Sequence, residues 1–172
     1  ILFQEKNKDE FYKIAQKVIS DMGIECHTPN FGILSGVWAR ACELYAQLMG
    51  TVVDYGEAHS KAHNHDRYGF SYEGRPLMGE PWNPEEKINL VGHSFGGETI
   101  RLFTSLMAFG CEDEIAATGE DTSPFFKGGN DSVHSCITLS SPHNGTQVAN
   151  ILYDPGYPLY GVVFMYNVIG ST

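Results

Sequence analysis

The chain has few basic side chains and lacks any long apolar run. Of its 172 residues, 11 are Lys or Arg and 21 are Asp or Glu, which gives a formal net charge of -10. This acidic balance argues against nucleic acid as a partner and against anchoring to anionic membranes through a basic patch. No apolar run approaches the roughly 20 residues that span a bilayer. The length is sufficient for one domain with its own core.

Signal-peptide and paired-cysteine patterns are also missing. Residues 1–4 lead directly into charged residues, and the first residue is not Met. We therefore expect a fragment or processed piece of a longer protein. None of the four cysteines forms a C-x-x-C pair: Cys26, Cys42, Cys111 and Cys136. Because Cys42 and Cys136 lie in apolar helix-like and strand-like contexts, we expect buried free thiols, without excluding a disulfide.

The most informative pattern that is present is G-x-S-x-G, at residues 92–96. An apolar run at 88–91 precedes it and a helical pattern follows it, so the order is strand, sharp turn, helix. Such a turn presents a serine hydroxyl clear of the backbone, where a base and an acyl carbon can reach it. We therefore predict that Ser94 is the nucleophile of an acyl-transfer reaction. The ordinary alternative is a serine that caps a helix in a Gly-rich turn.

Hydrophobic periodicity predicts alternating helices and short buried strands. Apolar residues recur at helical spacing over 11–22, 35–49 and 98–109. Short apolar runs predict strands over 24–29, 87–91 and 132–139. This alternation indicates an α/β fold with a parallel sheet. Because reactive groups collect at the carboxyl ends of such strands, Ser94 and the loop at 140–146 should share one edge.

Two further segments have no clear periodicity. Residues 51–82 are irregular, aromatic and rich in histidine, and this length is sufficient for a site of its own. Residues 113–130 are polar and predict a surface excursion. The apolar stretch at 162–169 fits either the start of a lid or a core helix.

Seven stretches occur in a fixed order along the chain: 38–43, 53–56, 58–65, 67–69, 92–97, 125–129 and 141–146. Together they resemble the bacterial true lipases, in particular the zinc-containing thermophilic and staphylococcal branch. The resemblance implies an α/β-hydrolase core, with a mostly parallel sheet flanked by helices. It also implies a single partial domain over 1–172, incomplete at both ends, with a histidine-rich insertion at about 51–82.

The same resemblance implies the chemistry. Ser94 would form an acyl-enzyme during hydrolysis of triacylglycerol or related carboxylic esters, and the backbone N–H of Phe95 would form half of the oxyanion hole. The other oxyanion donor, the catalytic acid and the catalytic histidine would lie outside these residues. We therefore expect the chain alone to be a poor esterase. The expected partner is a lipid or ester substrate at an oil–water interface, and the expected location is extracellular.

The resemblance assigns no cofactor to catalysis but implies a structural zinc ion. The family's two zinc-binding histidines match His59 and His65, and neutral imidazoles are good zinc ligands. An aspartate ligand of the family falls at Ala39 here. A polar loop with hydrogen-bonded surface histidines is therefore an open alternative to a metal site.

One histidine after the elbow, His143, falls at the reactive edge and is a candidate base. It needs an orienting carboxylate, and Asp131 lies before the strand, far from that edge. A structural loop residue is therefore the favoured role for His143. Two alternatives to a lipase stay open: a thioesterase or acyltransferase, and a catalytically inactive binding or scaffold relative.

Overall fold

The computed structural model describes residues 9–32 and 35–145. The predicted lid or core helix at 162–169 lies outside these residues. The helix α1 (Asp9–Asp21) comes first, followed by the 13-residue helix α2 (Val37–Met49). Gly50 ends α2 in the left-handed conformation, with φ of 64°, a conformation that glycine adopts without a side-chain clash. Both helices confirm the periodicity of the sequence.

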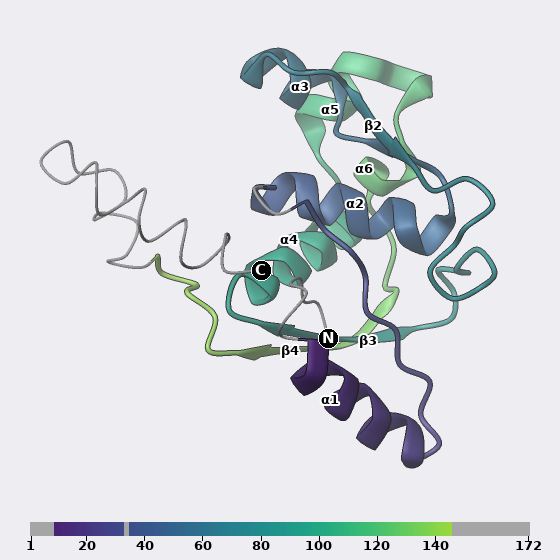
Figure 1. Ribbon diagram of the computed structural model, residues 1–172. Helices are drawn as coiled ribbons and strands as arrows, with labels where there is room; N and C mark the ends of the chain where they lie inside the picture. The colour runs from purple at the N-terminus through teal and green to yellow at the C-terminus, as the bar shows by residue number, and fades with distance from the viewer. Residues whose placement is uncertain (1–8, 33–34, 146–172) are drawn as a thin grey trace, which may run out of the picture.

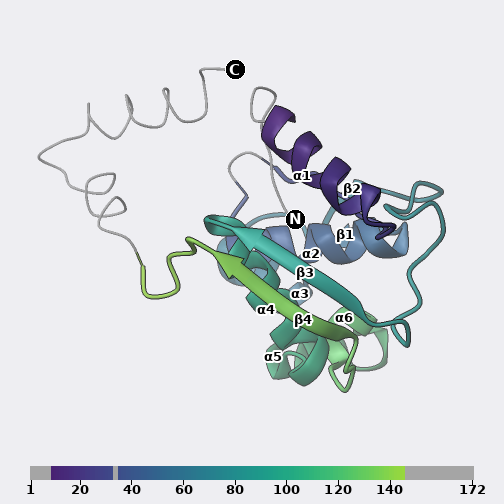
Figure 2. The ribbon, with the colours of Figure 1, turned by 90° about the horizontal axis from the view of Figure 1, so that it is seen from below.

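A parallel pair of strands carries the elbow. The strand β3 (Ile88–His93) pairs in parallel with β4 (Val133–Leu139), and the helix α4 (Phe95–Phe109) follows β3 after a single residue. α4 packs against both strands and against α2. Figure 1 shows α4 between α2 and this sheet, with α1 on the other side of the sheet, and Figure 2 shows the two strands side by side. These elements form the predicted α/β arrangement.

The hydrophobic core lies mainly between α2 and α4. Ile100 and Phe103 of α4 are fully buried, and they belong to one cluster with Ala41 and Leu44 of α2. The side of the sheet away from α4 is more open, since Ile137 and Leu139 of β4 are each 50% exposed.

The segment predicted as irregular contains three short regular elements. It contains the strand β1 (Val52–Asp54), the helix α3 (Glu57–His63) and the strand β2 (Tyr68–Ser71). β1 and β2 form a separate antiparallel pair. Each element is too short for its periodicity to stand out in the sequence.

Two sequence predictions are wrong. Residues 24–29 are not a strand, because no described strand pairs with them. Residues 113–130 are not merely a polar excursion, since they contain α5 (Glu112–Thr118), a 3-10 turn η1 (Gly119–Asp121) and α6 (Pro124–Lys127). Phe125 and Phe126 of α6 are each 1% exposed and belong to the core. The periodicity failed there because α6 spans only four residues.

Candidate active site and histidine cluster

Ser94 occupies a strained turn between β3 and α4. Its φ of 50° and ψ of -127° are unusual for a residue with a side chain, and such conformations cost about 1–3 kcal/mol. The backbone N–H of Ser94 donates to the carbonyl of Leu139 at 2.9 Å, which continues the ladder between the strands. The residue is exposed. The turn therefore holds the serine at the open edge of the sheet.

Two glycines make this turn possible. A Cβ on Gly92 would lie 2.5 Å from the carbonyl oxygen of Gly96, closer than real Cβ contacts allow. A Cβ on Gly97 would lie 1.8 Å from Ser141 Oγ. At Gly92 the strand and the first helical turn therefore approach one another as backbone, which is the packing that the G-x-S-x-G pattern predicts. Gly97, just after the pattern, leaves room for the Ser141 side chain.

The backbone N–H of Phe95 begins α4, a 15-residue helix. The N-terminal end of a helix carries partial positive charge and favours a developing negative charge. The Phe95 ring is 39% exposed and lies 5.0 Å from the Arg40 guanidinium carbon. Burial lowers the pKa of Arg40, with Glu43 acting in the opposite direction. Arg40 thus connects α2 to the start of the elbow helix.

The loop after β4 lies at the same sheet edge as Ser94. In the parallel register His93 is the partner of Leu139, so Ser94 and Ser140 follow paired residues. This placement confirms the predicted shared edge for residues 140–145. Asp131, by contrast, forms an ion pair with Lys87 at the start of the two strands.

A carboxylate that the sequence reasoning missed lies beside His143. Glu98 Oε1 is 2.9 Å from His143 Nδ1. Glu98 is four residues after Ser94, one helical turn along α4. This four-residue spacing from the serine is the sequence signal for the carboxylate. The nitrogen Nε2 of the same ring is 3.0 Å from Thr138 Oγ1.

The three histidines of the insertion lie together. The His59 ring lies 4.4 Å from the His63 ring and 5.3 Å from the His65 ring, centroid to centroid. His59 also stacks on Trp38 at 4.8 Å. Burial, together with the smaller effects of His63 and His65, lowers the pKa of His59 to about 4. His59 is therefore neutral at neutral pH.

These histidines line a hollow with a cavity volume of about 550 Å³, together with Trp38, Ala39 and Tyr68. Ala39 offers no ligand atom. In the described part of the chain, no group of three or more His, Cys, Asp or Glu side chains is arranged to hold a metal ion. Of the two nearby aspartates, Asp66 also lines the hollow, whereas Arg67 binds Asp54 through two hydrogen bonds of 2.8 Å each. The described residues therefore do not form a complete zinc site.

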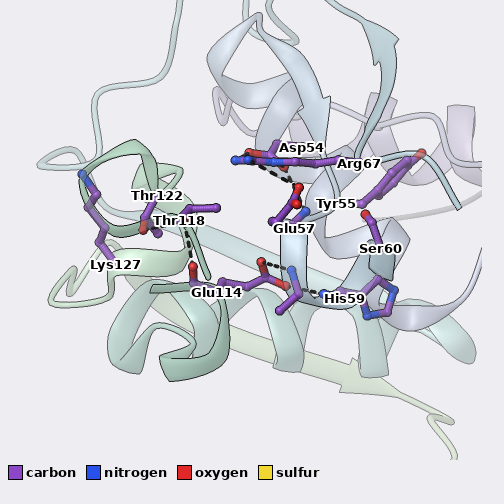
Figure 3. A network of polar contacts seen from close by, with 12 residues as sticks. Asp54, Tyr55, Glu57, His59, Ser60, Arg67, Glu114, Thr118, Thr122 and Lys127 are labelled. Atoms are coloured by element: carbon purple, nitrogen blue, oxygen red, sulfur yellow. Dashed lines mark hydrogen bonds and ion pairs between the residues drawn. The ribbon is translucent and has the colours of Figure 1, made fainter. Parts of the chain in front are cut away.

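Glu114 of α5 attaches the insertion to the rest of the molecule. Its carboxylate accepts the backbone N–H groups of Ala58 at 3.0 Å and His59 at 2.8 Å (Figure 3). The residue is 2% exposed. A Cβ on Gly56 would lie 2.4 Å from this carboxyl group. Glu114 therefore satisfies the free donors at the start of α3, a role that a capping side chain usually fills locally.

All four cysteines are free thiols, as the sequence predicts. Cys42 is buried as expected, but Cys136 is exposed, so the expected burial of its thiol in the strand is wrong. Among residues 9–32 and 35–145, no helix is long and apolar enough to cross a membrane.

Comparisons with known proteins place these features in a family. A family model described as "Lipase-like, C-terminal domain" matches residues 4–159. A "Lipase" of Staphylococcus epidermidis strain RP62A is 40% identical over 138 residues, which cover 78% of this chain and 20% of that protein. "Lipase 2" of Staphylococcus aureus strain MRSA252 is 41% identical over 143 residues, which cover 81% of this chain and 20% of that protein.

Solved structures of a lipase and of a protein named EstA are also similar to this chain. The crystal structure of Staphylococcus hyicus lipase superposes with a TM-score of 0.75 at 37% identity, covering 91% of this chain and 41% of that one. EstA from Clostridium botulinum superposes with a TM-score of 0.73 at 41% identity, covering 86% and 34%. The chain spans about one fifth of the length of the curated relatives that it matches.

Proposed function

Because this chain belongs to the lipase-like C-terminal domain family, we propose that it carries the nucleophile of a lipase that hydrolyses triacylglycerol or related carboxylic esters. The resemblance to lipases of the staphylococcal branch is confirmed by the relatives at about 40% identity. The observation that carries the proposal is the strained backbone of Ser94 at the end of β3, with φ of 50° and ψ of -127°.

In the proposed mechanism, Ser94 Oγ attacks the ester carbonyl and loses its proton to a histidine base. The carbonyl oxygen becomes an oxyanion, and the Phe95 N–H donates to it. The alcohol departs with a proton from the same base, which leaves an acyl-enzyme on Ser94. Water then attacks the acyl carbon while the base takes its proton, the bond to Ser94 Oγ breaks, and the base returns the proton to Ser94 as the fatty acid leaves. The core that holds these groups is an α/β-hydrolase sheet, of which β3 and β4 are two parallel strands.

We propose that the base and its acid come from parts of the full-length protein outside the described residues. His143 is the candidate base at the sheet edge of Ser94, but both of its ring nitrogens contact protein groups, Glu98 and Thr138. A base needs a free lone pair that faces the serine. The substrate would be a lipid ester, and the resemblance favours an extracellular enzyme.

The test is hydrolysis of a long-chain p-nitrophenyl ester by the full-length protein and its Ser94→Ala variant. We expect the variant to lose nearly all activity, because the nucleophile is absent. Unchanged activity would remove Ser94 from the mechanism. An inactive wild-type protein would favour the scaffold alternative, and preference for a thioester would favour the thioesterase.

The zinc ion stays a separate proposal, limited to a partial site at His59 and His65. It requires further ligands from outside the described residues, since Ala39 supplies none. Calorimetry on the full-length protein should show zinc uptake that His59→Ala weakens. Lys61→Ala, an exposed change in the same helix, is the matched control. No uptake, or equal uptake by all three proteins, would remove the site.

A further inference from the structure

Glu98 and His143 form a buried contact between the elbow helix and the loop after β4. Glu98 Oε1 and His143 Nδ1 lie 2.9 Å apart. Both atoms are inaccessible to solvent, and within 9–32 and 35–145 neither has a well-aligned hydrogen bond. The contact is therefore a close polar contact without the alignment of a hydrogen bond. Each atom depends on the other, because removal of one leaves the other buried without a partner.

The other side of the His143 ring is also held. Its Nε2 lies 3.0 Å from Oγ1 of Thr138, the second-last residue of β4. The loop itself makes two tight backbone hydrogen bonds, from His143 N to Ser141 O at 3.0 Å and from Gly145 N to Pro142 O at 2.8 Å. His143 thus bridges a compact loop, its parent strand and α4.

This loop rests directly on the first turn of the elbow helix. Gly97 has no room for a Cβ, because Ser141 Oγ would be 1.8 Å and Thr138 Cβ 3.1 Å away. Gly97 lies two residues after Phe95, whose N–H is the proposed oxyanion donor. A movement of the loop would therefore be transmitted to the first turn of α4.

We propose that Glu98 and His143 are a positioning pair, which fixes the first turn of α4 so that the Phe95 N–H and Ser94 keep their reactive geometry. This inference rests on the proposed function. Neither residue touches the reacting atoms. The pair acts on the transition state through the oxyanion donor, where displacements below 1 Å are costly.

The test compares variants of the full-length protein in ester hydrolysis. Glu98→Ala removes the contact, whereas Glu98→Gln keeps an oxygen that can accept from His143. Thr138→Val removes the hydroxyl on the other side of the ring. Asp131→Ala is the matched control, since it breaks an exposed ion pair that joins the start of the same two strands. Thermal unfolding verifies that each variant is folded.

We expect Glu98→Ala to lower kcat by about tenfold while KM changes by less than about twofold, the pattern of a lost transition-state interaction. Glu98→Gln should recover most of kcat, and Asp131→Ala should match the wild type. If Glu98→Ala does not fold, Thr138→Val should still lower kcat selectively. A kcat for Glu98→Ala equal to that of the control would overturn the pair, as would equal losses in Glu98→Gln and Glu98→Ala.

Labelling of Ser94 separates the positioning role of Glu98 and His143 from the nucleophile role of Ser94. A fluorophosphonate that reacts with Ser94 equally fast in wild type and Glu98→Ala contradicts the positioning pair alone. A wild-type protein in which Ser94 does not react contradicts the nucleophile assignment itself.

Discussion

Ser94 and Ser140 end neighbouring parallel strands with the same backbone angle, φ of 50°. Each follows a member of the paired residues His93 and Leu139. Both strands therefore turn sharply at one level of the sheet. The nucleophile and the loop that supports its helix consequently share an edge.

The close approach of Gly97 to this loop gives the first prediction. Gly97→Ala places a Cβ 1.8 Å from Ser141 Oγ and 2.5 Å from Ser141 Cβ, so the loop must shift. We expect a loss of about 1–3 kcal/mol in the free energy of unfolding, as in other overpacked sites. Urea unfolding measures it. Gly36→Ala is the control, because a Cβ there meets nothing within 4 Å. Equal stability of the two variants would contradict the packing.

The second prediction concerns Glu114, which caps α3 from a distance. Glu114→Ala leaves the N–H groups of Ala58 and His59 without their acceptor. We expect a loss of about 1–3 kcal/mol, the cost of unsatisfied buried donors. Asp113→Ala, an exposed carboxylate in the same helix, is the control. Amide hydrogen exchange should show faster exchange in α3 for Glu114→Ala only, and unchanged protection there would argue against the cap.

The sequence predicted the elements whose patterns are long. α2 and α4 span 13 and 15 residues, and both were found from the spacing of apolar residues that pack together in the core. The elbow was found because its glycines and serine must follow one another in sequence. Hydrophobic periodicity detects patterns among residues that are close in sequence.

Contacts between distant segments were missed. Glu114 lies among three consecutive acidic residues, and nothing in the sequence distinguishes the buried one. Its partners are 55 and 56 residues away. The Glu98–His143 contact joins a helix to a loop across a strand crossover. The proposed strand at 24–29 failed for a related reason, since a strand needs a neighbour that sequence alone does not supply.

The third prediction is a pH dependence from His59. Its pKa of about 4 in the folded protein is below the ordinary 6.5, chiefly because of burial. The imidazole therefore binds a proton more readily in the unfolded chain than in the folded protein. The contribution of neutral His59 to the free energy of unfolding is fully present above about pH 6.5 and is lost as the pH decreases towards 4.

The matched variant is His59→Phe, which keeps a ring against Trp38 but does not titrate. Urea unfolding at about pH 7 and about pH 4.5 should show a larger loss of stability for the wild type than for the variant. An identical loss in both proteins would mean that His59 is not buried as the stacking on Trp38 indicates.

The central claim, that the turn after β3 presents an acyl-transfer nucleophile, is tested most directly by covalent labelling. The full-length protein is treated with a fluorophosphonate and digested, and the modified residue is identified by mass spectrometry. We predict one adduct, on Ser94, that Ser94→Ala abolishes while Ser140→Ala, at the neighbouring strand end, does not. Absence of an adduct on Ser94, or a stoichiometric adduct on another residue, would contradict the claim.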